Sequence, residues 1–146
     1  MVSKTSLQPS TEIRVVSISD TDLLELAKNI RKNAHAPYSN YWVGAAILDD
    51  QLNVHTACNV ENAAFPLSAC AEANAIGSMV AAGSRHIRVI VIVGGYTEAG
   101  HCPPCGGCRQ RIKEFADENT RILLLTKQGE LATYKIEQLL PESFEF

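Results

Sequence analysis

Two cysteine-containing segments could perform chemistry together. Cys70 precedes Glu72 by two positions, and Cys105 and Cys108 form a Cys-x-x-Cys pair directly after a proline. Three thiolate ligands would leave the fourth position of a tetrahedral zinc ion open for water. Zinc lowers the pKa of such a water molecule towards neutrality, and a nearby carboxylate that is not a ligand can carry its protons. The two segments therefore predict a hydrolytic zinc site with Glu72 as its acid–base group.

The spacing also indicates where the metal lies. Residues two apart do not share a helix face, so Cys70 and Glu72 reach one ion only if it lies beyond the tip of a helix. Cys105 and Cys108 stand at a second expected helix start. We therefore expect the metal to face two helix N-termini, whose free N–H groups stabilise thiolates.

A structural metal site or a redox pair is the alternative for an isolated Cys-x-x-Cys. A closed zinc site would need a fourth ligand, and Cys58, Cys102 and His101 are available. Such a site gives no reason for a glutamate two residues after Cys70, so the catalytic interpretation is favoured.

Composition narrows the class of protein. The chain has 146 residues, of which 46% are hydrophobic and 20% charged, with a net charge of −3 and a pI of about 5.8. The acidic balance and the scattered basic residues argue against a nucleic-acid partner. The longest apolar run, 89–93, is too short for a membrane span. Five cysteines without an apolar leader predict reduced, metal-binding thiols in the cytoplasm.

Periodicity predicts an α/β fold, a three-layer α-β-α sandwich around a mixed five-stranded sheet. We expect a flexible N-terminal arm over residues 1–17, with a possible short strand at 13–16, and one domain over 18–146. The first expected helix begins at residue 19 or 20 and ends before Pro37. Two further helices are expected at 68–82 and 105–117, and a short turn at 136–140. The expected strands cover 42–48, 54–59, 89–93, 122–125 and 131–134.

Beyond the cysteine segments, several stretches resemble the small homotetrameric cytidine deaminases. The resemblance covers residues 19–146. It rests on Ala36–Tyr41 with Val43–Ala46, on Cys58–Ala63, on Cys70–Glu72, on Pro104–Gln110, and on Leu139–Pro141 with Phe144. It implies a cytidine deaminase-like fold, a Zn²⁺ cofactor and a homotetramer.

The resemblance also implies roles for single residues. Zinc would be held by Cys70, Cys105 and Cys108, with Glu72 as proton shuttle and as a contact to ring N3. The backbone around Ala71 and Ser68 would hold the base.

Four further positions have an implied role and an ordinary alternative. Asn59 and Glu61 would bind the ribose 3′-hydroxyl, although such residues also satisfy backbone groups in turns. Tyr41 would line the base and Phe144 would reach a neighbouring subunit's site, although both could be core aromatics.

The chain departs from the family at three positions. Ala73 stands where an arginine usually follows the glutamate, which removes a cation from beside three thiolates, and Arg109 is a candidate substitute. Phe65 replaces a common tyrosine near the sugar. Trp42 replaces a smaller residue in the strand that enters the base site.

The expected activity is hydrolytic deamination of free cytidine and 2′-deoxycytidine, with release of ammonia. The first alternative is deamination of a modified cytosine nucleoside, either N4-substituted or blasticidin-like, although Asn59 and Glu61 favour a ribonucleoside. The second alternative is a non-catalytic, zinc-stabilised subunit, against which the intact Glu72 argues. No nucleic-acid or membrane partner is expected.

Overall fold

The structure is a computed structural model that describes residues 17–146. Its helices are α1 (Asp20–Arg31), the 3₁₀ helix η1 (Phe65–Leu67), α2 (Ala71–Ala81), α3 (Gly106–Glu114) and α4 (Ile136–Leu139), and its strands are β1 (Trp42–Asp49), β2 (Val54–Cys58), β3 (Ile87–Gly95), β4 (Arg121–Leu125) and β5 (Leu131–Tyr134). The strand expected at 13–16 and nearly all of the predicted arm lie outside the described residues. No helix in residues 17–146 is long and apolar enough to cross a membrane.

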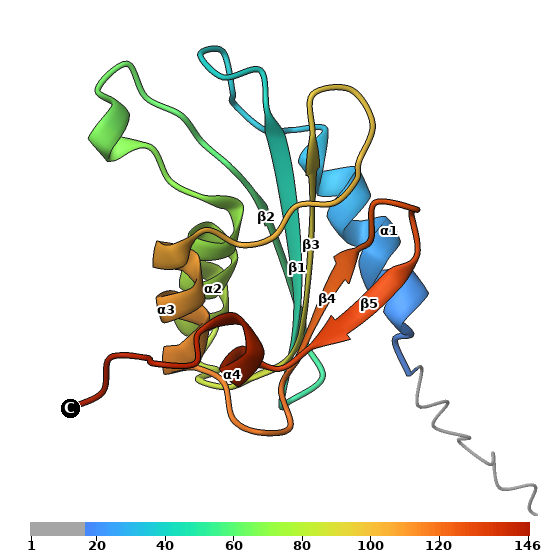
Figure 1. Cartoon of the computed structure of the whole chain (residues 1–146), viewed down its shortest axis with the longest axis vertical. Coiled ribbons are helices and arrows are strands. Elements are labelled where there is room, and N and C mark those ends of the chain that lie inside the picture. The colour runs from blue at the N-terminus through green and yellow to red at the C-terminus, as the bar shows by residue number, and fades with distance from the viewer. Residues whose placement is uncertain (1–16) are drawn as a thin grey trace, which may run out of the picture.

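The five strands form one mixed sheet in the order β2-β1-β3-β4-β5 (Figure 1). β1 pairs with β2 and β3 in antiparallel fashion, β3 and β4 are parallel, and β5 returns antiparallel to β4. The parallel pair requires a crossover, which α3 supplies. The expected mixed five-stranded sheet is therefore confirmed.

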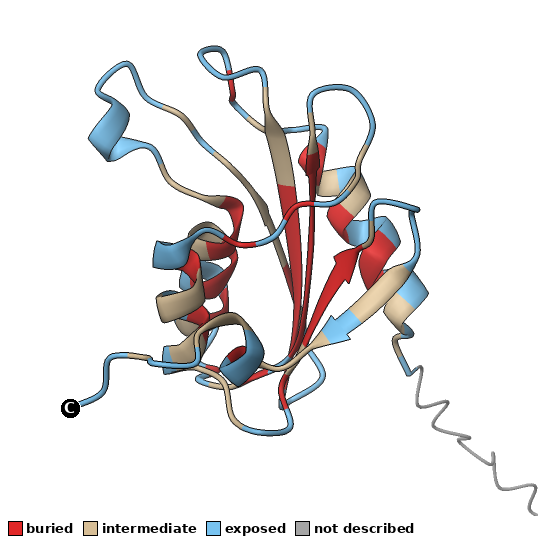
Figure 2. Cartoon of the chain, viewed as in Figure 1, coloured by how far each residue is buried: buried red, intermediate tan, exposed pale blue. Residues whose placement is uncertain are grey.

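Helices cover both faces of the sheet, as expected for a three-layer fold: α1 lies on one face, and α2, α3 and α4 lie on the other (Figure 1). Successive side chains of the central strands point to opposite faces of the sheet, so they belong to two separate hydrophobic cores. Ile90 and Ile92 belong to the core under α2 and α3, whereas Val89 and Val91 belong to the core under α1. Figure 2 shows the three central strands buried over most of their length.

The first helix begins where predicted but ends earlier. Ser19 and Asp22 form a capping box, in which the Ser19 hydroxyl accepts a hydrogen bond from the Asp22 N–H at 3.1 Å. The expected end before Pro37 is wrong, because α1 stops at Arg31. The chain then extends so that the His35 N–H can bond the Asn59 carbonyl.

The expected starts and ends of the other helices are also shifted. The second helix was expected from residue 68, yet Ala69 is extended and exchanges two backbone hydrogen bonds with Val60, so α2 begins at Ala71. The third was expected over 105–117, yet α3 ends at Glu114, and a turn bonding the Thr120 N–H to the Asp117 carbonyl follows it. Both expected helices were too long, because the backbone at these ends makes hydrogen bonds that are not those of a helix.

Arg31 fixes the end of the sheet at which β1 begins and β3 ends. Its side chain is 7% exposed. It donates hydrogen bonds to the carbonyls of Trp42 (2.9 Å), Gly95 (2.6 Å) and Thr97 (3.1 Å). Gly44 makes this approach possible, because a Cβ there would lie 2.1 Å from the Ala27 carbonyl oxygen and 2.8 Å from the Arg31 Cβ.

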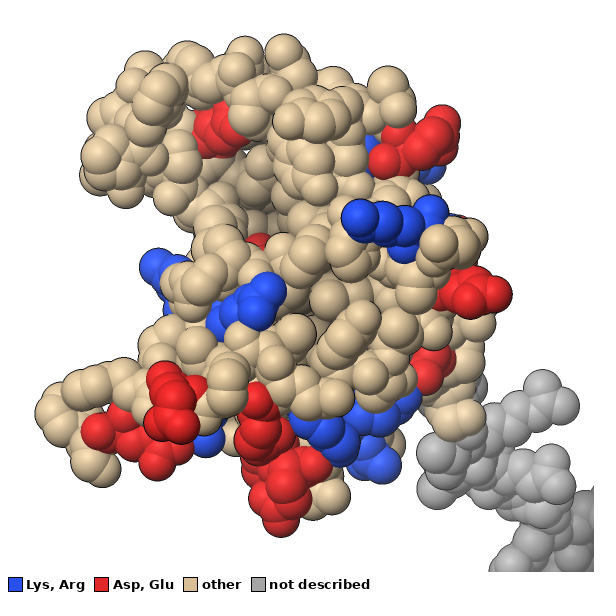
Figure 3. Space-filling view, in the orientation of Figure 1, with Lys and Arg blue, Asp and Glu red and all other residues tan. Residues whose placement is uncertain are grey.

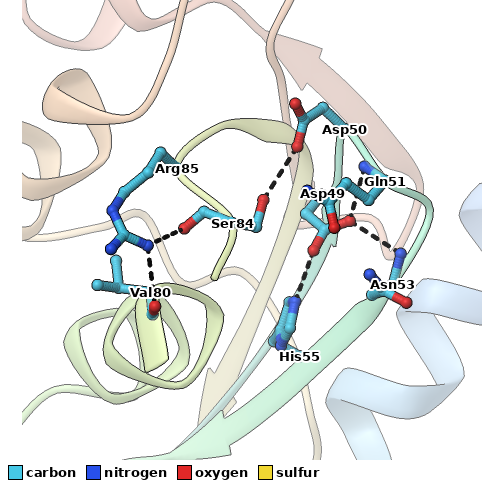
Figure 4. A network of polar contacts seen from close by, with 8 residues as sticks. All are labelled: Asp49, Asp50, Gln51, Asn53, His55, Val80, Ser84 and Arg85. Carbon is cyan, nitrogen blue, oxygen red and sulfur yellow. Dashed lines mark hydrogen bonds and ion pairs between the residues drawn. The ribbon is translucent and has the colours of Figure 1, made fainter. Parts of the chain in front are cut away.

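The opposite end of the sheet holds a buried acid–base pair (Figure 4). The fully buried Asp49 accepts a hydrogen bond from His55 at 2.8 Å and two more from the N–H groups of Gln51 and Asn53. Burial alone would raise the pKa of Asp49, but these hydrogen bonds outweigh it, so the pKa lies below the usual aspartate value. Nearby, the hydroxyl of Ser84 donates to the exposed Asp50.

We predict that Asp49→Ala lowers the free energy of unfolding by about 3 kcal/mol, because it leaves buried donors without their acceptor. Asp50→Ala is the matched control and should cost about 1 kcal/mol, the value of one hydrogen bond. Chemical denaturation measures both. Because folding lowers the pKa of Asp49, its contribution is present above the ordinary aspartate pKa of about 4 and is lost as the pH falls further. Equal losses in the two variants at neutral pH would contradict the assignment.

Candidate metal centre and adjoining cavity

Three cysteine sulfurs meet where two helices begin. Cys70 is the N-cap of α2 and Cys105 is the N-cap of α3, while Cys108 lies in the first turn of α3. The three sulfur atoms all lie within 4.8 Å of one another. The predicted arrangement, in which the metal ligands gather at two helix N-termini, is therefore present.

The donor set fits zinc with one open position. Zn–S distances of about 2.3 Å in a tetrahedron place sulfurs about 3.8 Å apart, and the observed cluster is compatible with that spacing. Among residues 17–146, the cluster contains none of the proposed fourth ligands: Cys58 ends β2, and His101 is exposed with its ring bonded to the Leu125 carbonyl. Three ligands and a free side are typical of catalytic zinc rather than structural zinc.

The three thiols differ in burial, and two of them interact with each other. Cys108 is fully buried, Cys70 is half-buried and Cys105 is exposed. A hydrogen bond between the first two lowers the pKa of Cys70 to about 6 and raises that of Cys108. One of the three ligands is thus a thiolate near neutral pH, which favours capture of a cation.

A cavity of about 310 Å³ opens beside the cluster. It is lined by Tyr41, Val43, Asn59, Glu61, Ser68, Ala69, Cys70, Ala71, Glu72, Cys102, Pro103 and Cys105. In Figure 3 a hollow with mostly uncharged walls lies between the projecting segment around η1 and the body of the molecule. The volume is that of a small-molecule site.

Glu72 lies in the first turn of α2 and is only 4% exposed, although it lines the cavity. Burial raises the pKa of its carboxyl above the ordinary glutamate value. A carboxyl with a raised pKa accepts and returns a proton near neutral pH more readily than an exposed one does. The geometry therefore places an acid–base group beside the sulfur cluster.

Tyr41 and Cys102 lie next to each other in one wall of the cavity. Burial and the neighbouring Cys102 thiol raise the pKa of Tyr41 to about 12, so its hydroxyl stays protonated. A Cβ on Gly94 would lie 2.7 Å from the Cys102 sulfur, so this glycine makes room for the wall. The sequence pattern gave Cys102 only as a spare ligand, and no local signal placed it against the aromatic ring.

Asn59 and Glu61 line the same cavity but already bind backbone groups. The amide of Asn59 accepts from the Val43 N–H at 2.8 Å and donates to the Tyr41 carbonyl at 2.9 Å. The carboxylate of Glu61 accepts from the N–H groups of Tyr38 and Ser39 and from the Ser39 hydroxyl. Both residues therefore stabilise the backbone of the turn, as the alternative interpretation expects. Because both also line the cavity, their binding of a ligand stays a prediction.

Residues 17–124 match the family described as the cytidine and deoxycytidylate deaminase zinc-binding region. The chain belongs to this family. A cytidine deaminase of Sporosarcina psychrophila is 35% identical over 84% of this chain and 88% of its own length. The crystal structure of a cytidine deaminase from Burkholderia pseudomallei superposes with a TM-score of 0.78 at 39% identity, over 86% of this chain and 99% of that one. A blasticidin-S deaminase of Bacillus cereus is 30% identical over 86% of this chain and 92% of its own length.

Two departures from this family's usual sequence are not among the residues that line the cavity. Trp42 begins β1 between Tyr41 and Val43, and only those two neighbours line the cavity, because alternate strand residues face opposite ways. Phe65 is 68% exposed and packs edge-on against Tyr38, with ring centroids 5.6 Å apart.

The candidate substitute for the family arginine is occupied elsewhere. Arg109 donates to the carbonyls of Pro104 (2.8 Å) and Leu139 (2.7 Å), so it ties α3 to the C-terminal segment. Phe144 is also exposed, beside Phe146, and its backbone pairs with Gln110 outside the cavity. The position that follows Glu72 is an alanine near the start of α2, and Arg109 does not supply the guanidinium that the family usually has there.

We predict that the purified protein carries one zinc ion per chain and that Cys105→Ser reduces this to well below one, because two ligands cannot hold the ion against a chelator. Cys58→Ser is the matched control, and it should keep one zinc because Cys58 is outside the cluster. Elemental analysis after dialysis against a weak chelator measures the zinc content per chain of each variant. Zinc retained by Cys105→Ser and lost by Cys58→Ser would contradict the assignment.

Proposed function

We propose that the protein is a hydrolase that converts free cytidine and 2′-deoxycytidine to uridine and 2′-deoxyuridine with release of ammonia. The observation that carries the proposal is the buried Glu72 beside a three-cysteine cluster at the floor of a cavity of about 310 Å³. Membership of the deaminase family and the cytidine deaminase names of several relatives support it.

The proposed chemistry is carried by Glu72. Cys70, Cys105 and Cys108 would hold zinc, which would supply Lewis-acid activation of the attacking water. Glu72 takes a proton from that water and delivers it to ring N3, then passes the second proton to the departing amino group at C4. The water oxygen bonds to C4, the C4–N bond then breaks with release of ammonia, the oxygen remains as the C4 carbonyl, and the glutamate returns to its starting state.

The rest of the cavity fits a nucleoside. We assign the base to the space between Tyr41 and the backbone at Ala71, above the sulfur cluster. The ribose would lie towards Asn59 and Glu61. The Asn59 amide has one lone pair and one N–H beyond those that the backbone uses, and Glu61 also keeps acceptor capacity. Both can thus bind a hydroxyl without releasing the turn that they hold.

Deamination of a modified cytosine nucleoside is the second candidate. The likeness to a blasticidin-S deaminase and the alanine at residue 73 favour it. A zinc-stabilised subunit without activity is disfavoured, because Glu72 would then be a buried acid without a role. Thiol ligands suit a reducing compartment, so we place the protein in the cytoplasm.

A nucleoside panel that follows ammonia release tests the function. It contains cytidine, 2′-deoxycytidine, N4-substituted cytidines, blasticidin S, adenosine and cytidine monophosphate. We expect turnover of the first two. Glu72→Gln should lower the rate by about 10²–10⁴-fold while zinc content stays at one, because glutamine carries no proton. Glu98→Gln, an exposed residue outside the cavity, is the matched control. Turnover of blasticidin S without turnover of cytidine would favour the alternative, and a fully active Glu72→Gln would overturn the mechanism.

We also propose a homotetramer, in which Phe144 of one subunit reaches a neighbour's cavity. Apolar side chains around the mouth of the cavity are exposed in the single chain, namely Tyr38, Val60, Phe65 and Leu67, at 47–71%. Such clustered exposure is typical of a contact surface. Phe144 is 67% exposed and makes its ring contact with Phe146 alone among the aromatic residues described.

Light scattering should give a mass about four times the 15.9 kDa of one chain. The double variant Phe65→Asp/Leu67→Asp should dissociate, because two buried charges at an apolar contact are costly. Leu52→Asp, an exposed leucine in the β1–β2 hairpin, is the control and should stay assembled. A wild-type monomer that turns over cytidine at the full rate would contradict the shared site.

A further inference from the structure

An unpaired arginine lies one helical turn after the last cysteine of the cluster. Arg111 follows Cys108 by three positions and Gly107 by four on α3, so the three residues share one face of the helix. Long side chains on a helix lean towards its N-terminus. Arg111 does so here, because a Cβ on Gly107 would lie only 3.1 Å from its Nη1 atom.

The guanidinium of Arg111 thus lies over the first turn of α3, where two of the three sulfurs are. A Cβ at residue 107 would require the guanidinium to shift by a few tenths of an ångström, so Gly107 leaves room for its present position. Basic side chains gather over α3, directly below the hollow in Figure 3.

Four arginines in residues 17–146 have donors in use, whereas Arg111 and Arg88 do not, and of these two only Arg111 lies on α3 with the cysteines. Arg31, Arg85, Arg109 and Arg121 all donate to carbonyls or a carboxylate. Within residues 17–146 no carbonyl, carboxylate or other acceptor bonds to Arg111. Its charge is therefore available to Cys108, one helical turn before it on the same face of α3.

The cluster needs such a charge. Three thiolates around one Zn²⁺ leave a net charge of −1, and an ionised Glu72 beside them adds a second negative charge. Excess negative charge in a partly buried site weakens both the binding of anionic ligands and the acidity of a metal-bound water. Residue 73, in the first turn of α2, is an alanine and carries no cation.

We propose that Arg111 is the cation that offsets the thiolate charge, and that it sets the affinity of the site for zinc. The proposal rests on the zinc site proposed above and assigns it a positioning residue on α3.

Zinc affinity of the full chain, measured by competition with a chromophoric chelator, tests this. Arg111→Gln removes the charge at similar length and should weaken zinc binding on the order of tenfold, the low end for residues that act on metal ligands. Arg111→Lys keeps the charge and should retain most of the affinity. Arg88→Gln, an exposed arginine on β3 away from the cavity, should match the wild type.

Salt separates an electrostatic role from a packing role. The Debye length falls from about 10 Å at 0.1 M to about 3 Å at 1 M, so the gap between wild type and Arg111→Gln should narrow at high salt. Wild-type zinc affinity in Arg111→Gln at 0.1 M salt would overturn the proposal. An equal loss in Arg111→Lys that persists at 1 M salt would also overturn it, because that pattern indicates lost packing.

The outcome is independent of the reaction. If the wild type deaminates no nucleoside in the panel while the order of zinc affinities holds, the proposed activity fails and the role of Arg111 stands. If the wild type deaminates cytidine while Arg111→Gln binds zinc as tightly as the wild type does, the proposed activity stands and the role of Arg111 fails.

Discussion

The convergence of three sulfurs on two helix N-termini is the constraint on which the rest of the site depends. Cys70 and Cys105 belong to different helices, so their sulfurs meet only if α2 and α3 lie side by side on one face of the sheet. The apolar core beneath them, which includes Ala75, Ile90 and Ile112, holds the two helices there. The geometry of the metal site therefore depends on the apolar core between the sheet and these two helices. A substitution in that core would move the cysteine ligands even where the substituted residue does not contact them.

Much of this could be predicted from sequence because the signals are local. The run 89–93 predicts a central strand, and Ser19 with Asp22 marks a helix start; both follow from side-chain chemistry within a few residues. The end of α1 and the start of α2 could not be predicted, since hydrogen bonds to Asn59 and Val60, outside the local helical pattern, hold the backbone at His35 and Ala69 extended. Likewise the three ligands were visible as a spacing, whereas the contact between Tyr41 and Cys102 arises from the meeting of separate strands and loops.

Asn59 and Glu61 show why a role inferred from resemblance and an ordinary structural role need not exclude each other. Each residue holds a turn that forms the wall of the cavity, and each keeps hydrogen-bonding capacity on the cavity side. Fixing these polar groups through the backbone lowers the entropy lost when a ligand hydroxyl binds them. The same bonds that stabilise the free protein thus pre-organise the part of the site assigned to the sugar.

Two arginines show how burial decides what a charge can do. Arg31 is buried and donates three hydrogen bonds to backbone carbonyls, so its charge is committed to fixing the end of the sheet. Arg111 is exposed and keeps its donors, so it avoids the cost of desolvation but is screened by salt. Its guanidinium lies over the first turn of α3, where Gly107 adds no side chain and where Cys105 and Cys108 stand, so the charge can act on the metal site without being buried in it.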